Sequence, residues 1–246
     1  MAQLIPELEV VSLKPQRILH HARVPIEHVY FMESGLVSVL SNTDGVKHGV
    51  GVWLIGREGM VGISAVLGME ASPHRRVVQS EGSALRMRVT DLRSAMDNLP
   101  SLRPVLLRYV NGVLVQAGQS GVCNASHSLS QRLARWLLMV HDHLDCVDLP
   151  VTHATIAKML GARRASITEG IHILAKNNVI AQGRRLIRIV DRERLEHLSC
   201  SCYRTMRIEF ERHLLPRQAQ PSLRPTCDRP PTPSARAPVS LNSHGT

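Results

Sequence analysis

A glycine between two short amphipathic helices is the feature that most constrains how this chain can fold. Residues 152–177 read THATIAKMLGARRASITEGIHILAKN, with the small Ala157 four positions before Gly161. A small residue lets a second helix cross the first closely, and glycine can adopt the positive φ that a tight turn requires. The spacing therefore predicts a helix-turn-helix, with Thr152 as the N-cap of its first helix.

Paired arginines open the second predicted helix, whose exposed face would enter the major groove of DNA. A hairpin follows in VIAQGRRLIRIV, which predicts a wing that turns at Gln182-Gly183 and carries Arg184, Arg185 and Arg188 toward phosphates. The residues expected at a DNA interface are Thr152, His153, Arg163, Arg164, Ala165, Ser166, Thr168, Glu169, Arg184 and Arg185.

Positive charge is concentrated around the same motif. The formal net charge is +10, and residues 152–190 hold seven Lys and Arg against one acidic residue, which gives +6. A basic face attracts polyanions because phosphate neutralisation releases counterions. The charge therefore favours double-stranded DNA as a partner, with a merely solvated basic surface as the alternative.

The composition indicates a cytoplasmic protein of about two domains. The chain has 246 residues, of which 43% are hydrophobic, enough for two modest cores. It has no run of about 18 apolar residues and no hydrophobic signal core, so we expect no membrane partner. Five cysteines without a CxxC pair predict reduced thiols and no metal site, and Cys200 and Cys202 are expected on opposite sides of a helix.

Strand-length apolar runs separated by turn residues occupy residues 17–89. They include HVYFMES, GLVSVLSNTDG, KHGVGVWLIGREG, MVGISAVLG and RRVVQSEGSALRMRV. The pattern predicts an antiparallel β jelly roll or barrel, and hence an α+β fold for the whole chain. GLVSVLS does not alternate cleanly, so its strand is expected to be covered on both faces.

A long helix is expected from Leu102 to Cys123. Its apolar stripe occupies positions 102, 105, 106, 109, 110, 113, 114 and 117. We interpret this stripe as the interface of a homodimer, because DNA-reading helices usually act in pairs on two half-sites. Packing against the β domain is the alternative.

A further helix is expected from Asp191 to about Leu215, after the wing. The segment beyond Pro216 is rich in proline and poor in large apolar residues, which predicts disorder.

The order of barrel, long helix and winged helix-turn-helix, together with VYFMESGLVSVL and THATIAKMLGARRASIT, resembles the cyclic-AMP receptor protein and fumarate-nitrate regulator (Crp/Fnr) family of bacterial transcription factors. The resemblance covers about residues 15–199. It implies a homodimer that binds palindromic promoter DNA, with RNA polymerase as a partner of an activator. It divides the chain into a cyclic-nucleotide-binding-like sensor barrel (1–100), a dimerisation helix (101–124), a winged helix-turn-helix (125–199) and a C-terminal helix with a disordered Pro-rich tail (200–246).

Arg164 falls where the cyclic-AMP receptor protein has a base-reading arginine, and a bidentate contact to guanine would suit it. Ala165 and Glu169 stand where that protein has two further base readers. The operator sequence therefore cannot be inferred by analogy.

The sensor departs from the family pattern as well. Ile63 stands where the cyclic-nucleotide binders have a ribose-binding glutamate, and Arg75 or Arg76 is the candidate contact for an anionic effector. We therefore expect a cyclic nucleotide not to be the cofactor. The first cysteine is Cys123, which excludes the amino-terminal iron–sulfur mechanism of the family.

No sequence pattern indicates an enzyme. A cupin-like enzyme or carrier barrel, with the winged helix used for protein contacts, is the alternative function. A cupin metal site needs His and carboxylate ligands clustered on adjacent strands, whereas His48 and His74 stand alone. A nonspecific architectural DNA binder is a third possibility.

Overall fold

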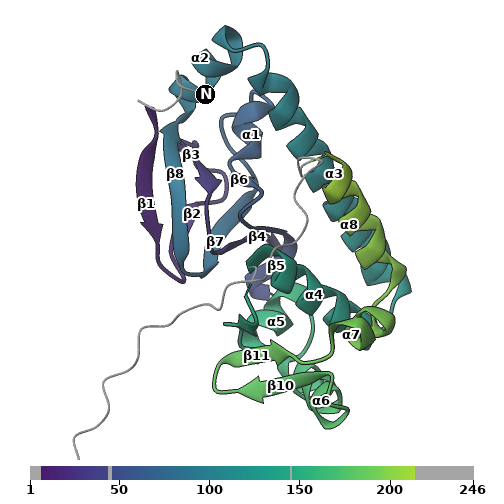
Figure 1. Cartoon of the computed structure of the whole chain (residues 1–246). Helices are drawn as coiled ribbons and strands as arrows, with labels where there is room; N and C mark the ends of the chain where they lie inside the picture. The colour runs from purple at the N-terminus through teal and green to yellow at the C-terminus, as the bar shows by residue number, and fades with distance from the viewer. Residues whose placement is uncertain (1–6, 44–45, 145, 214–246) are drawn as a thin grey trace, which may run out of the picture.

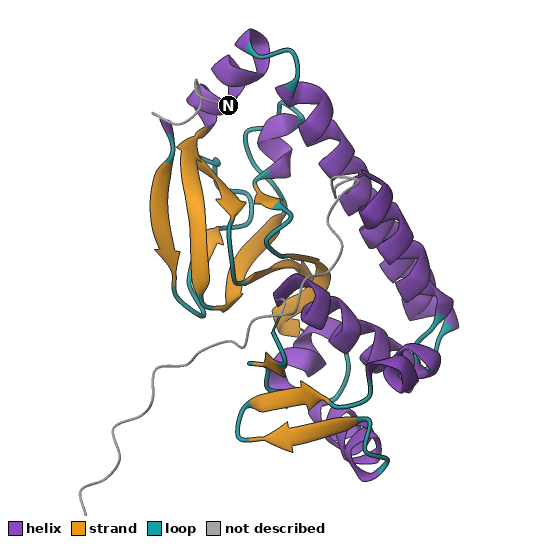
Figure 2. Cartoon of the chain, in the orientation of Figure 1, coloured by secondary structure: helices purple, strands orange, loops and turns teal. Residues whose placement is uncertain are grey.

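The computed structural model describes residues 7–43, 46–144 and 146–213. A β domain and a smaller winged domain both lie beside the long helix α3 (Leu102–Ser126), as Figure 1 shows. The strands gather in the barrel and in the wing, and helices connect the two (Figure 2). This is the α+β arrangement predicted from the sequence.

The barrel consists of two antiparallel four-stranded sheets, with strand orders β1-β8-β3-β6 and β2-β7-β4-β5. Its strands are β1 (Glu9–Leu13), β2 (Ile18–His20), β3 (His28–Met32), β4 (Leu36–Thr43), β5 (Val46–Ile55), β6 (Met60–Val61), β7 (His74–Ser80) and β8 (Gly82–Arg88). The antiparallel jelly roll is confirmed, and it begins earlier than predicted, at Glu9 rather than near residue 17.

The segment MVGISAVLG is not one strand. Only Met60–Val61 is extended, and Ile63–Val66 forms the short helix α1. Gly62 breaks the strand because it adopts φ +115°, which other residues rarely reach. The strand-length apolar run that suggested a strand instead buries Ala65 and Val66 in a helical turn.

Helix α2 (Val89–Asn98) leads into α3, and the apolar stripe predicted as a subunit interface is mostly used within the chain. Leu106, Tyr109, Val110 and Val113 are buried in the core of the barrel domain. Leu114, by contrast, is exposed. Packing within the chain, the alternative interpretation, therefore accounts for most of the stripe.

The winged domain contains α4 (Leu129–Leu144), β9 (Asp148–Leu149), α5 (His153–Leu160), α6 (Arg164–Lys176), β10 (Ile180–Gly183) and β11 (Leu186–Ile189). The wing is a three-stranded sheet, β10-β11-β9, rather than a hairpin alone. Gly183 pairs with Leu186, so the turn is Arg184-Arg185 and not Gln182-Gly183. Arg185 takes the positive φ of this turn, at 63°.

The carboxy-terminal helix is interrupted. Asp191 caps α7 (Arg192–Leu198) as expected, accepting a hydrogen bond from the Arg194 amide at 2.9 Å. Ser199 is extended, with ψ 164°, and a second helix, α8 (Ser201–His213), begins after it. The predicted Pro-rich tail lies outside the described residues.

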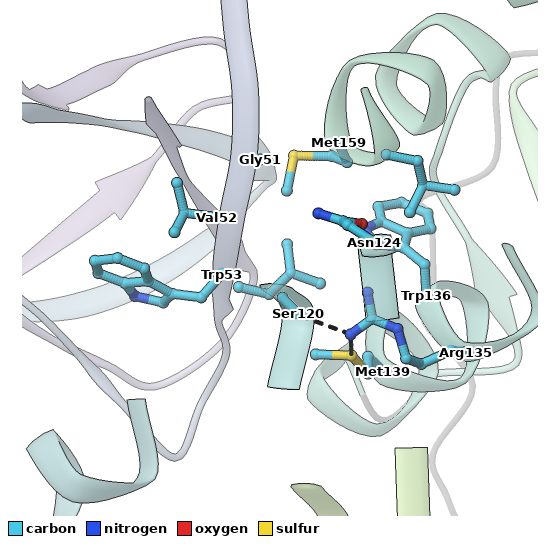
Figure 3. Close-up of a pocket in the computed structure, with 11 residues that line it drawn as sticks. Gly51, Val52, Trp53, Ser120, Asn124, Arg135, Trp136, Met139 and Met159 are labelled. Carbon is cyan, nitrogen blue, oxygen red and sulfur yellow. Dashed lines mark hydrogen bonds between the residues drawn. The ribbon is translucent and has the colours of Figure 1, made fainter. Parts of the chain in front are cut away.

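The winged domain packs directly against the barrel. Val37 and Val39 of β4 face the core of the barrel, whereas Leu36 and Leu40 belong to the core of the winged domain. Because successive residues of a strand point to opposite faces, β4 is covered on both sides, as the sequence indicated. The interface between the barrel and the winged domain is tightly packed, and the cavity within it has a volume of only about 20 Å³ (Figure 3).

Gly51 on β5 permits this close approach. A Cβ atom at Gly51 would lie 2.8 Å from the carbonyl oxygen and 2.9 Å from the Cα atom of Met159 in α5. We expect Gly51→Ala to lower the free energy of unfolding by about 1–3 kcal/mol, because backbone must move to accept the methyl group. Gly183→Ala is the control, since its nearest contact would be an ordinary 3.6 Å. Denaturant unfolding measures the stability of both variants. Equal stability would contradict the close packing of β5 against α5 at Gly51.

Candidate nucleic-acid interface

The turn of the helix-turn-helix has the geometry that its sequence predicts. Gly161 ends α5 at φ 59° and ψ 38°, in the left-handed region. The Thr152 Oγ1 atom accepts a hydrogen bond from the Thr155 amide at 3.1 Å and so caps α5. Ile167 of α6 and Ile156 of α5 are fully buried, which fixes the angle between the two helices.

Helix α6 presents an open concave surface to solvent. The hollow has a volume of about 680 Å³ and is lined by Arg164, Ala165, Thr168, Glu169, His172 and Gln182. Arg163 caps the helix and is also exposed, whereas Ser166 is half-buried. The first turn of α6 therefore presents two arginines to solvent.

His153 joins the two helices and the wing. Its Nδ1 atom lies 3.0 Å from Thr168 Oγ1, and its Nε2 atom lies 3.2 Å from Gln182 Nε2. The Thr168 hydroxyl donates its proton to the Arg164 carbonyl at 3.0 Å, so its oxygen can only accept a hydrogen bond from His153 Nδ1. His153 is therefore protonated at Nδ1 and accepts from the Gln182 amide. This network fixes α6 relative to the wing.

The tip of the wing carries Arg184 and Arg185, both exposed. Arg188 differs from them, because its Nε and Nη2 atoms donate to the two carboxylate oxygens of Asp148 at 2.7 and 2.8 Å. This hydrogen bonding lowers the pKa of Asp148. The predicted phosphate role of Arg188 is thus weakened, since an acidic neighbour already balances its charge.

Four of the ten predicted interface residues, Arg164, Ala165, Thr168 and Glu169, line this hollow, and His153 contacts it through Thr168. The hollow is also lined by His172, which the sequence placed on the exposed face of this helix without naming it as a contact, and by Gln182, which it did not expect there. His172 lies two turns into α6, on the face that carries Arg164 and Thr168, as helical spacing indicates. Gln182 was assigned to the turn, and its position became clear only from the strand register.

One buried ion pair connects the barrel to the winged domain. Glu58, between β5 and β6, accepts a hydrogen bond from His143 Nδ1 of α4 at 2.9 Å, with side chains 16% and 9% exposed. Burial lowers the pKa of His143, but the adjacent Glu58 carboxylate and the charge of Asp142 raise it by more. Burial likewise raises the pKa of Glu58, yet the contact with His143 and two backbone amides leaves it below its ordinary value. Both shifts favour the charged form of each partner, and the contact links the two domains.

Arg75 and Arg76, the predicted effector contacts, lie on opposite faces of β7. Arg75 faces the winged domain, where its charge helps burial to lower the pKa of Lys158 in α5. Arg76 is 1% exposed on the barrel side and donates from Nη1 to the His74 carbonyl at 2.7 Å. Burial lowers its pKa to about 10. The two arginines therefore cannot bind one effector together.

Two family models match the chain, and together they cover more than half of it. The cyclic nucleotide-binding domain matches residues 10–98, and the Crp-like helix-turn-helix domain matches residues 131–198. No curated relative matches the sequence. In the described parts of the chain, no helix has both the length and the apolar character needed to cross a bilayer.

Several solved structures share this fold at low sequence identity. FixK2 from Bradyrhizobium japonicum is 16% identical, with a TM-score of 0.69 over 78% of this chain and 98% of its own. TTHA1359, a regulator of the CRP/FNR family from Thermus thermophilus, is 21% identical, with a TM-score of 0.63 over 78% and 98%. TTHB099, a CRP-family regulator from the same organism, is 17% identical, with a TM-score of 0.65 over 77% and 96%.

Proposed function

We propose that this chain, which belongs to the Crp/Fnr family of transcription regulators, acts as a homodimer that binds palindromic promoter DNA. Helix α6 enters the major groove, and the wing tip contacts the flanking phosphates. The protein acts by binding rather than by catalysis, and it works in the cytoplasm, where promoter DNA is found. RNA polymerase is its partner wherever it activates transcription.

The exposed surface of α6 is the observation that carries this proposal. Its first turn combines a free arginine fork at Arg164 with an acceptor at Glu169 one turn later. Arginine can donate two hydrogen bonds to guanine, and a carboxylate can accept one from the cytosine amino group. The His153 network joins α6, which carries these side chains, to the wing, and such support favours sequence-specific reading.

Substitutions of Arg164 and Arg184 are expected to weaken DNA binding in different ways. Arg164→Ala should weaken binding to the specific site by about 1–3 kcal/mol and leave binding to random DNA nearly unchanged. Arg184→Ala should weaken binding to both DNAs to a similar extent, because a phosphate contact carries no sequence information. The operator is first obtained by selection from random DNA, and gel-shift titrations then compare the variants. Equal losses for Arg164→Ala on both DNAs would remove its base-reading role.

A second face of α3 supports the homodimer. Leu107, Asn111, Leu114, Gly118, Gly121 and Ala125 are all exposed and alternate at spacings of four and three residues. This is the heptad pattern of a helix that pairs with a second helix. A Cβ atom at Gly118 or Gly121 would meet nothing within 4 Å, so two copies of α3 can approach closely there. We refer to these six residues as the α3 seam.

The barrel is the sensor, and its effector is not a cyclic nucleotide. Ile63 begins α1 at the position where a ribose-binding glutamate would be needed. Arg76 is the one of the two predicted arginines that faces the barrel side, and it is the candidate contact for an anionic effector. Signals from the barrel reach α6 through the close contact between β5 and α5 at Gly51 and through the Glu58–His143 ion pair.

A further inference from the structure

Three cysteines and a histidine from distant parts of the chain meet where α3 ends. Cys123 lies in the last turn of α3 and His127 caps that helix, while Cys200 and Cys202 flank the start of α8. One ligand atom from each residue lies within 4.8 Å of every other. From this geometry, we propose that Cys123, His127, Cys200 and Cys202 bind one zinc ion.

The distances fit a tetrahedral centre. Zn–S bonds of about 2.3 Å and Zn–N bonds of about 2.0–2.1 Å place the sulfurs about 3.8 Å apart and a sulfur about 3.5 Å from a nitrogen. Cys202 Sγ lies 3.5 Å from His127 Nδ1, and Cys123 Sγ lies 3.4 Å from Cys200 Sγ. Four protein ligands leave no open position, which is typical of a structural zinc site.

Local structure explains how the ligands converge. Cys123 and His127 are four residues apart and therefore lie on one face of α3. Cys200 precedes α8 because Ser199 breaks the helix, so the two thiols of the Cys200-Ser-Cys202 segment are not forced onto opposite sides as predicted. Helix α8 returns along α3 (Figure 1), which brings the two halves together.

The surroundings of the cluster supply the positive charge that a loaded site needs. Binding of Zn²⁺ releases three thiol protons, and three thiolates with one Zn²⁺ leave one net negative charge. Arg135 is 4% exposed and acts electrostatically on Cys123. Within the described ranges it forms no ion pair, and its Nη1 atom contacts Ser120 Oγ at 3.3 Å and two methionine sulfurs. A buried cation without a carboxylate is costly, and the metal centre would balance it.

An outer hydrogen bond completes the site. Gln119 Nε2 donates to Cys202 Sγ at 3.3 Å, an interaction that orients a thiolate ligand toward a metal. All four proposed ligands also lie outside the two matched family domains, of which the first spans residues 10–98 and the second spans residues 131–198. The site would fasten α8 to the corner between α3 and α4.

Metal analysis of the full-length chain tests the proposal. The protein is purified under reducing conditions from cells grown in zinc-supplemented medium. Its metal content is measured by mass spectrometry after dialysis against a weak chelator. We expect about one zinc per chain in the wild type and in Cys146→Ser, a buried cysteine outside the cluster, and less than about one tenth as much in Cys202→Ser. Strong chelation should lower the melting temperature of the wild type on the order of 10 °C.

A readout on the wild type alone covers the case in which the variant does not fold. Titration with a thiol-specific mercurial should release one zinc for every three thiols modified within the cluster, and cobalt-loaded protein should show the visible absorption of tetrahedral thiolate-bound Co²⁺. Several outcomes would overturn the proposal: a wild type without zinc, zinc content unchanged in Cys202→Ser, iron with acid-labile sulfide in place of zinc, or a Cys123–Cys200 disulfide that persists in protein purified under reducing conditions.

Discussion

Replacing Glu58 by glutamine is expected to lower the free energy of unfolding by about 3–5 kcal/mol. Removal of one partner from a buried ion pair leaves the other charge uncompensated in a medium where water cannot solvate it. His143 is 9% exposed and contacts the ring of Phe210 at a centroid distance of 6.2 Å, so the protonated imidazole has little access to solvent. Denaturant-induced unfolding at pH 6 measures the difference between Glu58→Gln and the wild type.

Glu81→Gln is the matched control, because Glu81 is exposed on the barrel and the same chemical change there should alter stability by less than about 0.5 kcal/mol. A second comparison separates the two domains. If Glu58 links them, Glu58→Gln should speed proteolysis of the connection between α3 and α4 more than proteolysis within the barrel. A variant as stable as Glu81→Gln would show that the ion pair contributes nothing.

The stability difference should also depend on pH. The raised pKa of His143 means that its contribution is complete below 6.5, its ordinary value, and is lost as pH rises through its value in the folded protein. The lowered pKa of Glu58 means that its contribution is present above 4.5 and is lost as pH falls through its folded value. The gap between wild type and Glu58→Gln should therefore be widest between about pH 4.5 and 6.5, with Asp142 and Tyr109 as the other ionisable groups that act on the pair.

The helix-turn-helix was predictable from sequence because its constraints are local. Ala157, Gly161 and the Thr152 cap act within ten residues of one another, and their spacing is enough to fix the turn. The barrel was predictable as a class, since turn residues separate its strands. Gly62 shows the limit of that reasoning, because a short apolar run does not distinguish a strand from one buried helical turn.

The free face of α3 could not be identified from periodicity. Leu106 and Leu107 are equally apolar, yet Leu106 is buried against the barrel and Leu107 is exposed. The position of the barrel decides between them, and sequence spacing carries no such information. The cysteine cluster was missed for a similar reason, since Cys123 and Cys200 are brought together only when α8 folds back along α3.

Introducing a charge into the α3 seam is expected to abolish dimerisation. Leu114 is 64% exposed and lies near the middle of the seam, so Leu114→Glu places two carboxylates face to face in a paired α3. Loss of the dimer converts two linked half-site contacts into one, which should weaken binding to a palindromic operator by about 10²–10⁴-fold. Sedimentation velocity and gel shifts on the same samples measure the two effects together.

Val105→Glu is the control for this prediction. Val105 is 47% exposed on the same helix, but nine positions before Leu114, which rotates it about 180° away from the seam. It should therefore leave both the dimer and DNA affinity unchanged. Because Leu114 is exposed within one chain, Leu114→Glu should itself unfold at nearly the wild-type denaturant concentration once dimer dissociation is accounted for. A dimeric Leu114→Glu protein would mean that the two copies meet on a different surface, and full operator affinity in a monomeric one would mean that a single α6 is sufficient to recognise the site.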